Sequence, residues 1–349
     1  MNGLLRASRT GNPVGEDGKR TRYPSVVCVG IRTEWAFGQV EWYRGSHRLK
    51  KILEAVKDGQ IQSRCVQAIA SRFPSIASVT IMDLSVECEA FGGTIRFVEN
   101  EVPTTIGAVV NDMNDAEALK MPEVGAGRTG VYLHAAHLAA QATTDRPVFG
   151  CHIGPFSLAA RLCGMTEIMV KLRKEPVMVE TVLNKCTAFL VQYAKAYKKT
   201  GVNGIVIAEP AAGLINAAQC EKFSSIHVSR IVSAVQDENF LIIIHNCGNT
   251  HKLVPAMLAT GAMGFHFGNA VDMKQIMPQV PAHIPAFGNI APILFRNGSS
   301  MEVREKTTEL LMAMKDYPNF VLSSGCDIPP GTPLGNIDAL FDALADYNT

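Results

Sequence analysis

From about residue 75 onward, the chain alternates short apolar runs with longer stretches whose apolar residues are spaced three and four apart. Short apolar runs are typical of buried strands, and the longer spacing is typical of amphipathic helices. The expected strands are Ala77–Met82, Pro147–Cys151, Gly204–Ala208, Phe240–Ile244, Ala262–Phe265, Ile284–Gly288 and Phe320–Ser323. The expected helices are Ser46–Val56, Arg128–Ala140, Met178–Lys198, Ala217–Gln236, His251–Ala259, Met301–Lys315 and Asn336–Tyr347. This alternation predicts an α/β fold with helices packed on a parallel sheet.

A polar or metal-competent side chain comes at or just after the end of nearly every expected strand. These residues are Asp83, His152, Glu209, His245, His266, Asn289 and Cys326. In a TIM barrel, the carboxyl ends of the strands form the face on which the active site is built. An open doubly wound sheet would give a similar alternation. The even distribution of polar strand ends favours a TIM-like (β/α)8 barrel, with Val26–Gly30 as one candidate for the eighth strand.

The first part of the chain has weak apolar periodicity. We interpret residues 1–45 as an N-terminal extension and residues 46–349 as one barrel domain. A single domain of this size is common among α/β barrels.

Three of the polar residues form the donor set of a zinc site. His245 and Cys247 are two positions apart at a strand end, so on an extended segment their side chains point the same way. Cys326 would join them from a distant strand. Catalytic zinc sites use imidazole nitrogen and thiolate sulfur from three residues and keep a fourth position for substrate. The ordinary alternative is that the three are half-buried residues without a metal, since free cysteines are often buried.

Four further rim residues have both a functional and a structural interpretation. Asp83 and Glu209 are acids or bases in the first and helix-capping or hydrogen-bonded carboxylates in the second. His152 and His266 are either site residues or core histidines with satisfied hydrogen bonds.

Composition restricts the partners and the compartment. The formal net charge is +1, and we find no basic tract, so nucleic acid and acidic membrane surfaces are not expected partners. No apolar stretch reaches the roughly 18 residues of a membrane span, and residues 1–23 lack the apolar core of a signal peptide. The nine cysteines show no disulfide spacing and suit a reducing compartment. We therefore expect a cytoplasmic protein.

Several segments together carry a resemblance to a known family. They are His245-Asn246-Cys247-Gly248-Asn249-Thr250, Gly288-Asn289-Ile290, Ser323-Ser324-Gly325-Cys326-Asp327-Ile328-Pro329-Pro330-Gly331-Thr332-Pro333, Met82-Asp83-Leu84, Gly154-Pro155-Phe156-Ser157-Leu158 and Glu209-Pro210-Ala211-Ala212-Gly213-Leu214-Ile215. Over roughly residues 46–347 the chain resembles the uroporphyrinogen decarboxylase superfamily and, within it, the zinc-dependent methylcobamide methyltransferases.

The resemblance implies an enzyme that moves a methyl group between a corrinoid, carried on a partner protein, and a thiol or other small acceptor or donor. It implies Zn²⁺ as cofactor on His245, Cys247 and Cys326, with Asp83 and Glu209 as catalytic residues around the metal. His152 and Asn289 are expected to bind the cofactor. The direction of transfer stays open.

One departure from the family pattern concerns the fourth zinc ligand. Methyltransferases of this branch often carry an acidic residue shortly after the H-x-C segment, whereas this chain reads Gly264-Phe265-His266-Phe267-Gly268-Asn269. His266 or water is the expected replacement.

Two alternative functions stay open. The first is a porphyrinogen decarboxylase, which needs no metal. The decarboxylase branch is recognised by an arginine-bearing N-terminal segment, and residues 1–45 contain nothing like it. The second is a noncatalytic relative that binds a corrinoid protein.

Overall fold

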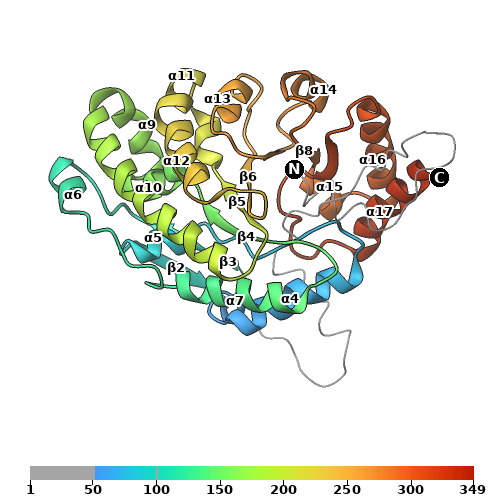
Figure 1. Cartoon of the computed structure of the whole chain (residues 1–349), viewed down its shortest axis with the longest axis horizontal. Coiled ribbons are helices and arrows are strands. Elements are labelled where there is room, and N and C mark those ends of the chain that lie inside the picture. The colour runs from blue at the N-terminus through green and yellow to red at the C-terminus, as the bar shows by residue number, and fades with distance from the viewer. Residues whose placement is uncertain (1–51, 100) are drawn as a thin grey trace.

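Seven parallel strands form one curled sheet at the centre of the molecule (Figure 1). The structure is a computed structural model and describes residues 52–99 and 101–349. The strands are β1 Ser78–Val79, β4 Val148–Ile153, β5 Gly204–Ala208, β6 Leu241–Asn246, β7 Gly264–Phe267, β8 Ala286–Ile290 and β9 Phe320–Ser324. Each pairs with the next in the order β1-β4-β5-β6-β7-β8-β9. This is the strand arrangement of the predicted TIM-like barrel, and Val26–Gly30 lies outside the described residues.

Helices cover the outside of the sheet (Figure 1). They are α3 Ile52–Ala55, α4 Gly59–Arg72, α5 Val86–Ala90, α6 Met113–Ala118, α7 Thr129–Ala142, α8 Pro155–Cys163, α9 Met165–Lys174, α10 Pro176–Lys199, α11 Ala217–Cys220, α12 Ile226–Val235, α13 Val254–Leu258, α14 Met273–Ile276, α15 Pro292–Asn297, α16 Ser300–Met314 and α17 Leu334–Asn348. Two 3-10 turns, η1 Pro210–Leu214 and η3 Met277–Gln279, and one π turn, η2 Glu221–Ser225, complete the set. No helix among the described residues is both long and apolar enough for a membrane span.

Two hydrophobic layers hold the barrel together. Along each strand, alternate side chains face the barrel interior and the outer helices. The interior layer contains Ala77, Phe149, Cys151, Val206, Ile243 and Phe287. The larger outer layer packs the other face of the strands against the helices and includes Phe156, Phe189, Tyr193 and Phe265. Period-two alternation therefore decides which residue of each strand end faces the barrel interior.

Some elements differ from the prediction. The predicted helix Ala217–Gln236 is divided into α11, η2 and α12, and β1 is shorter than the predicted strand Ala77–Met82. An antiparallel hairpin, β2 Thr94–Val98 and β3 Glu101–Ile106, was not predicted. Most hairpin residues are exposed or half-buried, so the pattern lacks the apolar run that identifies a core strand.

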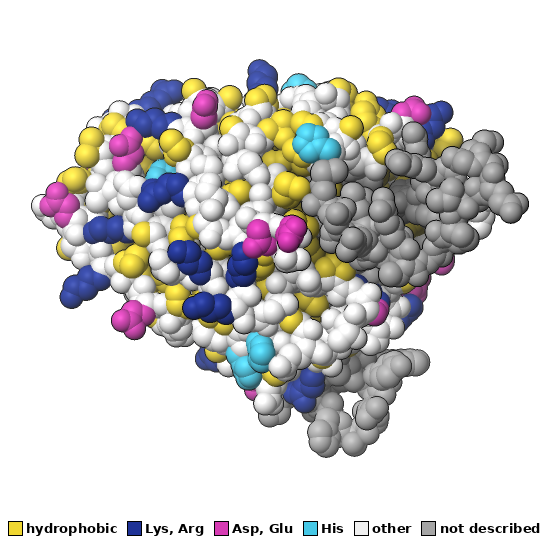
Figure 2. Space-filling model, in the orientation of Figure 1, with side chains coloured by type: hydrophobic (Ala, Val, Ile, Leu, Met, Phe, Trp, Pro, Cys, Tyr) yellow, Lys and Arg dark blue, Asp and Glu magenta, His cyan; other side chains and the backbone are white. Residues whose placement is uncertain are grey.

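Basic and acidic side chains are interspersed over the face shown in Figure 2. This mixture agrees with the formal net charge of +1. The visible face offers no extended field of one sign.

Candidate metal centre

The structure brings His245, Cys247 and Cys326 together at the carboxyl ends of the strands. One ligand atom from each lies within 4.8 Å of the other two. His245 is in β6, Cys247 follows that strand, and Cys326 follows β9. The Sγ of Cys326 lies 3.7 Å from Nε2 of His245. The i and i+2 spacing places His245 and Cys247 on the same side of their segment, as expected.

These distances fit a zinc ion. With Zn–S near 2.3 Å and Zn–N near 2.0–2.1 Å, tetrahedral geometry separates a sulfur and a nitrogen ligand by about 3.6 Å. The observed 3.7 Å between Cys326 Sγ and His245 Nε2 agrees with that separation. The donor set of one imidazole and two thiols is also the one that Zn²⁺ prefers.

The two sulfurs have opposite pKa shifts. The Cys326 thiol donates to the sulfur of Cys247, which lowers the pKa of Cys247 to about 7. The same hydrogen bond, together with burial, raises the pKa of Cys326. Cys247 is therefore the sulfur of the pair that ionises first.

His266 contacts the ring of His245 and lines the same cavity as the three donors. Its Nδ1 is 2.6 Å from Nδ1 of His245, and its Nε2 is 2.8 Å from the carbonyl oxygen of Ser324. Burial and the neighbouring His245 lower the pKa of His266 well below its usual value. Both ring nitrogens of His266 are engaged, so this position departs from the expectation that His266 is a fourth ligand.

A cavity of about 590 Å³ opens beside the three donors, and all three residues line it. Its apolar wall is formed by Val79, Met82, Leu84, Val102, Pro103, Val206, Ala208, Pro210 and Pro330. Its charged lining residues are Glu101 of β3, Arg161 of α8 and Asp327, next to Cys326. A pocket with a mostly apolar wall and a few polar groups is the usual form of a small-molecule site.

Asp83 does not line this cavity but belongs to a buried ion-pair cluster. One carboxylate oxygen accepts from Arg128 Nη1 at 2.5 Å and from the Tyr132 hydroxyl at 3.2 Å. The other accepts from the backbone N–H and hydroxyl of Ser85. Its side chain is fully buried. This environment matches the structural interpretation of Asp83.

Glu209 is turned toward the start of α8. Its two carboxylate oxygens accept backbone N–H groups of Phe156 at 3.1 Å and Ser157 at 2.6 Å. A carboxylate is stabilised there by the unpaired N–H groups and the helix dipole. Burial nevertheless raises the pKa of Glu209 to about 7, against these hydrogen bonds. The side chain fixes α8, which carries Arg161.

His152 and Asn289 are also held away from the cavity. His152 is inside β4, and its ring packs toward Tyr193 and Tyr197 of α10, on the outer face of the sheet. Burial lowers the pKa of His152 to about 4. The Asn289 amide donates to the carbonyl oxygens of Gly268 and Val271. Neither residue is brought to the three metal donors.

Two residues that shape the site were not predicted from the sequence. Arg161, in α8, lines the cavity together with residues of the hairpin, and neither α8 nor the hairpin was predicted. Asn246, between His245 and Cys247, donates to the carbonyl oxygen of Glu209 at 2.7 Å and accepts from Gly248 N–H at 2.8 Å. Its place inside the H-x-C segment was the available signal, since a buried asparagine there needs such partners.

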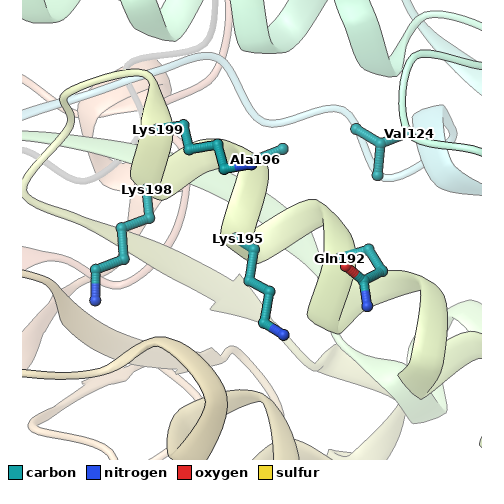
Figure 3. Close-up of a pocket in the computed structure, with 6 residues that line it drawn as sticks. All are labelled: Val124, Gln192, Lys195, Ala196, Lys198 and Lys199. Carbon is teal, nitrogen blue, oxygen red and sulfur yellow. The ribbon is translucent and has the colours of Figure 1, made fainter.

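A second cavity, of about 460 Å³, lies along the C-terminal half of α10 (Figure 3). Its lining residues are Val124, Gln192, Lys195, Ala196, Lys198 and Lys199. Lys198 pairs with Asp237, and Lys195 and Lys199 are exposed. This lining holds no metal-binding set and no nucleophile with a neighbouring base.

Comparison with known proteins agrees with the fold and with the methyltransferase resemblance. The model of the family described as uroporphyrinogen decarboxylase (URO-D) matches residues 37–347. Methylcobamide:CoM methyltransferase MtbA of Methanosarcina acetivorans is 31% identical over 270 residues, covering 76% of this chain and 78% of that protein. Methylcobamide:CoM methyltransferase MtaA of Methanosarcina barkeri is 25% identical, covering 77% and 78%. A uroporphyrinogen decarboxylase of Ruthia magnifica is 21% identical over 330 residues, covering 90% and 94%.

A solved structure confirms the fold. A methyltransferase from Methanosarcina mazei superposes with a TM-score of 0.82 at 24% identity, covering 99% of this chain and 98% of that one. The family match and the higher identity to MtbA confirm the resemblance inferred from the motifs. The chain therefore belongs to the uroporphyrinogen decarboxylase family and, within it, to the methyltransferase branch.

Proposed function

We propose that the chain is a zinc-dependent corrinoid methyltransferase that moves a methyl group between a corrinoid on a partner protein and a small thiol. The observation that carries the proposal is the cluster of His245, Cys247 and Cys326 on the wall of the barrel cavity. The relatives MtbA and MtaA are named for methylcobamide and CoM, which supports these two substrate classes.

Zn²⁺ held by these three residues would supply a Lewis-acid position that lowers the pKa of an acceptor thiol. Two thiolates and one neutral imidazole would offset the charge of the metal. The acceptor sulfur, once the thiol proton has left to solvent, would therefore keep the electron density that it needs to attack. It forms a bond to the methyl carbon as the bond between that carbon and the corrinoid cobalt breaks, and the electron pair of the broken bond stays with cobalt.

The cavity wall has two roles in this reaction. Its apolar residues reduce the water around the sulfur, which strengthens electrostatic interactions inside the cavity. Arg161 places a positive charge on the cavity wall, so we propose an acceptor thiol that carries an anionic group. Asp83 and Glu209 would act indirectly, by fixing the rim and α8.

The decarboxylase alternative is less well supported. It would leave the cluster of three metal donors without a role, whereas the methyltransferase uses all three. The division into an extension over residues 1–45 and a barrel domain from residue 46 stays a prediction, because residues 1–51 are outside the described part.

Elemental analysis and a transfer assay test the proposal. We expect about one zinc per chain and methyl transfer from free methylcobalamin to an anionic thiol, followed by the change in corrinoid absorbance. Cys326→Ala should lose both the zinc and the transfer. Cys65→Ala, in α4 and away from the cavity, is the matched control and should keep both. Full transfer activity in Cys326→Ala, or a zinc-free wild-type protein with activity, would contradict the proposal.

A further inference from the structure

The rings of His245 and His266 form a buried pair on neighbouring strands. The two residues are aligned in the register of β6 and β7. Their ring centroids are 4.6 Å apart, and their Nδ1 atoms are 2.6 Å apart. His266 is completely buried, so this short contact excludes water. One of the two Nδ1 atoms must therefore carry a hydrogen and donate a hydrogen bond to the other.

The Ser324 carbonyl decides which nitrogen donates. A carbonyl oxygen only accepts, so Nε2 of His266, at 2.8 Å, carries the hydrogen. A neutral imidazole has one N–H, and Nδ1 of His266 is therefore the acceptor. Nδ1 of His245 must then be the donor. This leaves Nε2 of His245 with a free lone pair, and that is the atom 3.7 Å from Cys326 Sγ.

We infer that His266 is a positioning residue that fixes His245 in the Nδ1–H tautomer, the form in which Nε2 can bind a metal. The inference deepens the proposed function and rests on its metal site. A ligating histidine generally donates its second nitrogen to a partner that sets its tautomer and ring orientation. Here that partner is a second histidine, oriented in turn by a backbone carbonyl.

The pair also links the two strands that supply the ligands. Ser324 is the last residue of β9 and lies two positions before Cys326. His266 reaches from the Ser324 carbonyl to His245, across the sheet from β9 to β6. The ring of His245 and the backbone that leads to Cys326 are therefore held by one chain of hydrogen bonds. A His266 that served as a ligand could not make both contacts.

Two variants with the same side-chain branching separate positioning from packing. His266→Asn keeps an acceptor oxygen near His245 Nδ1, whereas His266→Leu fills the core position without an acceptor. We expect His266→Leu to weaken zinc binding by about 10- to 100-fold in competition with a chelator. His266→Asn should stay within a few-fold of wild type, since the acceptor alone holds the tautomer.

Long-range ¹H–¹⁵N spectra of the metal-free wild-type protein give a second readout. We expect the proton of His245 on Nδ1, and its transfer to Nε2 or exchange between both in His266→Leu. Equal zinc affinities in the Leu and Asn variants, or a wild-type His245 protonated on Nε2, would overturn the inference. A wild-type protein that binds no zinc would instead refute the proposed function, and the tautomer would still be measured. The wild-type spectrum also decides the matter if His266→Leu does not fold.

Discussion

Glu87, in α5, is a buried carboxyl that lacks the support given to its neighbour Asp83. One of its oxygens accepts from Ile153 N–H at 3.3 Å, and the other has no hydrogen-bond partner. Burial raises the pKa of Glu87 to about 8. The side chain is therefore mostly protonated at neutral pH.

This shift predicts a pH dependence of stability. The folded-state pKa lies above the ordinary value of 4.5, so the folded state binds the proton more tightly than the unfolded chain. Glu87 then costs nothing below about pH 4.5 and destabilises the fold increasingly as the pH rises to about 8. The free energy of unfolding of Glu87→Gln relative to wild type should therefore increase by a few kcal/mol from pH 5 to pH 8. Chemical denaturation at the two pH values measures this difference. The same change at exposed Glu305 is the control, and an equal difference at both pH values would contradict the prediction.

At the scale of elements, Arg128 joins the segment that follows β1 to α5 and α7. Its guanidinium pairs with Asp83 at 2.5 Å and with Glu89 at 2.5 Å, and it lies over the ring of Phe97 in β2. The segment after β1, two helices and the hairpin are thus connected through one side chain. This connection holds Met82 and Leu84, on either side of Asp83, in the wall of the cavity.

Removing the charge of Asp83 should therefore be costly. Asp83→Asn would leave Arg128 buried beside only Glu89, and breaking a buried pair generally costs about 3–5 kcal/mol. The matched control is Asp338→Asn, which removes the partner of Arg72 in an ion pair that is a third to a half exposed. We expect a loss below about 1 kcal/mol there. Equal losses in the two variants, measured by urea unfolding, would show that the Asp83 cluster has no structural role.

The loop after β7 is packed against the backbone of Cys247. A Cβ added to Gly268 would lie 2.7 Å from the Cys247 carbonyl oxygen and would overlap its Cα. Gly268→Ala should displace Cys247 and weaken zinc binding on the order of tenfold, because ligand positions tolerate shifts of only about 0.5 Å. Gly130→Ala in α7 is the control, since its Cβ would meet Gly125 at an ordinary 3.6 Å. Unchanged zinc affinity in Gly268→Ala would show that the loop yields freely.

For the whole molecule, a bound metal would join strands that lie three places apart in the sheet. Ligands that bind only the folded state stabilise it by mass action, by about 2.7 kcal/mol at a hundredfold excess over Kd. The thermal midpoint should therefore rise with added zinc and fall on chelation. Cys326→Ala should show neither response, and a midpoint independent of zinc in the wild-type protein would contradict metal binding at this site.

Most of the fold could be predicted from the sequence because its core strands are buried on both faces. Six strands, from β4 to β9, lie within two residues of their predicted limits. The hairpin escaped prediction because its residues are mostly polar and exposed. The break in the helix Ala217–Gln236 also has no signal in the apolar spacing.

The site was predictable only where it follows the strand period. His245 and Cys247 share a face because they are two residues apart. His152 was misplaced because β4 extends to Ile153, so Cys151 faces the cavity and His152 faces the helices. The contact between the rings of His266 and His245 depends on side-chain orientations that no sequence pattern encodes.

The distance along the chain between the metal donors has a consequence for biosynthesis. His245 and Cys326 are 81 positions apart in the sequence, and β7 and β8 lie between their strands in the sheet. Both of these strands must therefore join the sheet before the two side chains can come together. A ribosome-bound chain that does not yet include β9 and Cys326 has only two of the three proposed ligands, His245 and Cys247. On the proposed function, tight zinc binding would therefore follow completion of the barrel, and fragments truncated before Cys326 should compete poorly for the metal in the cell.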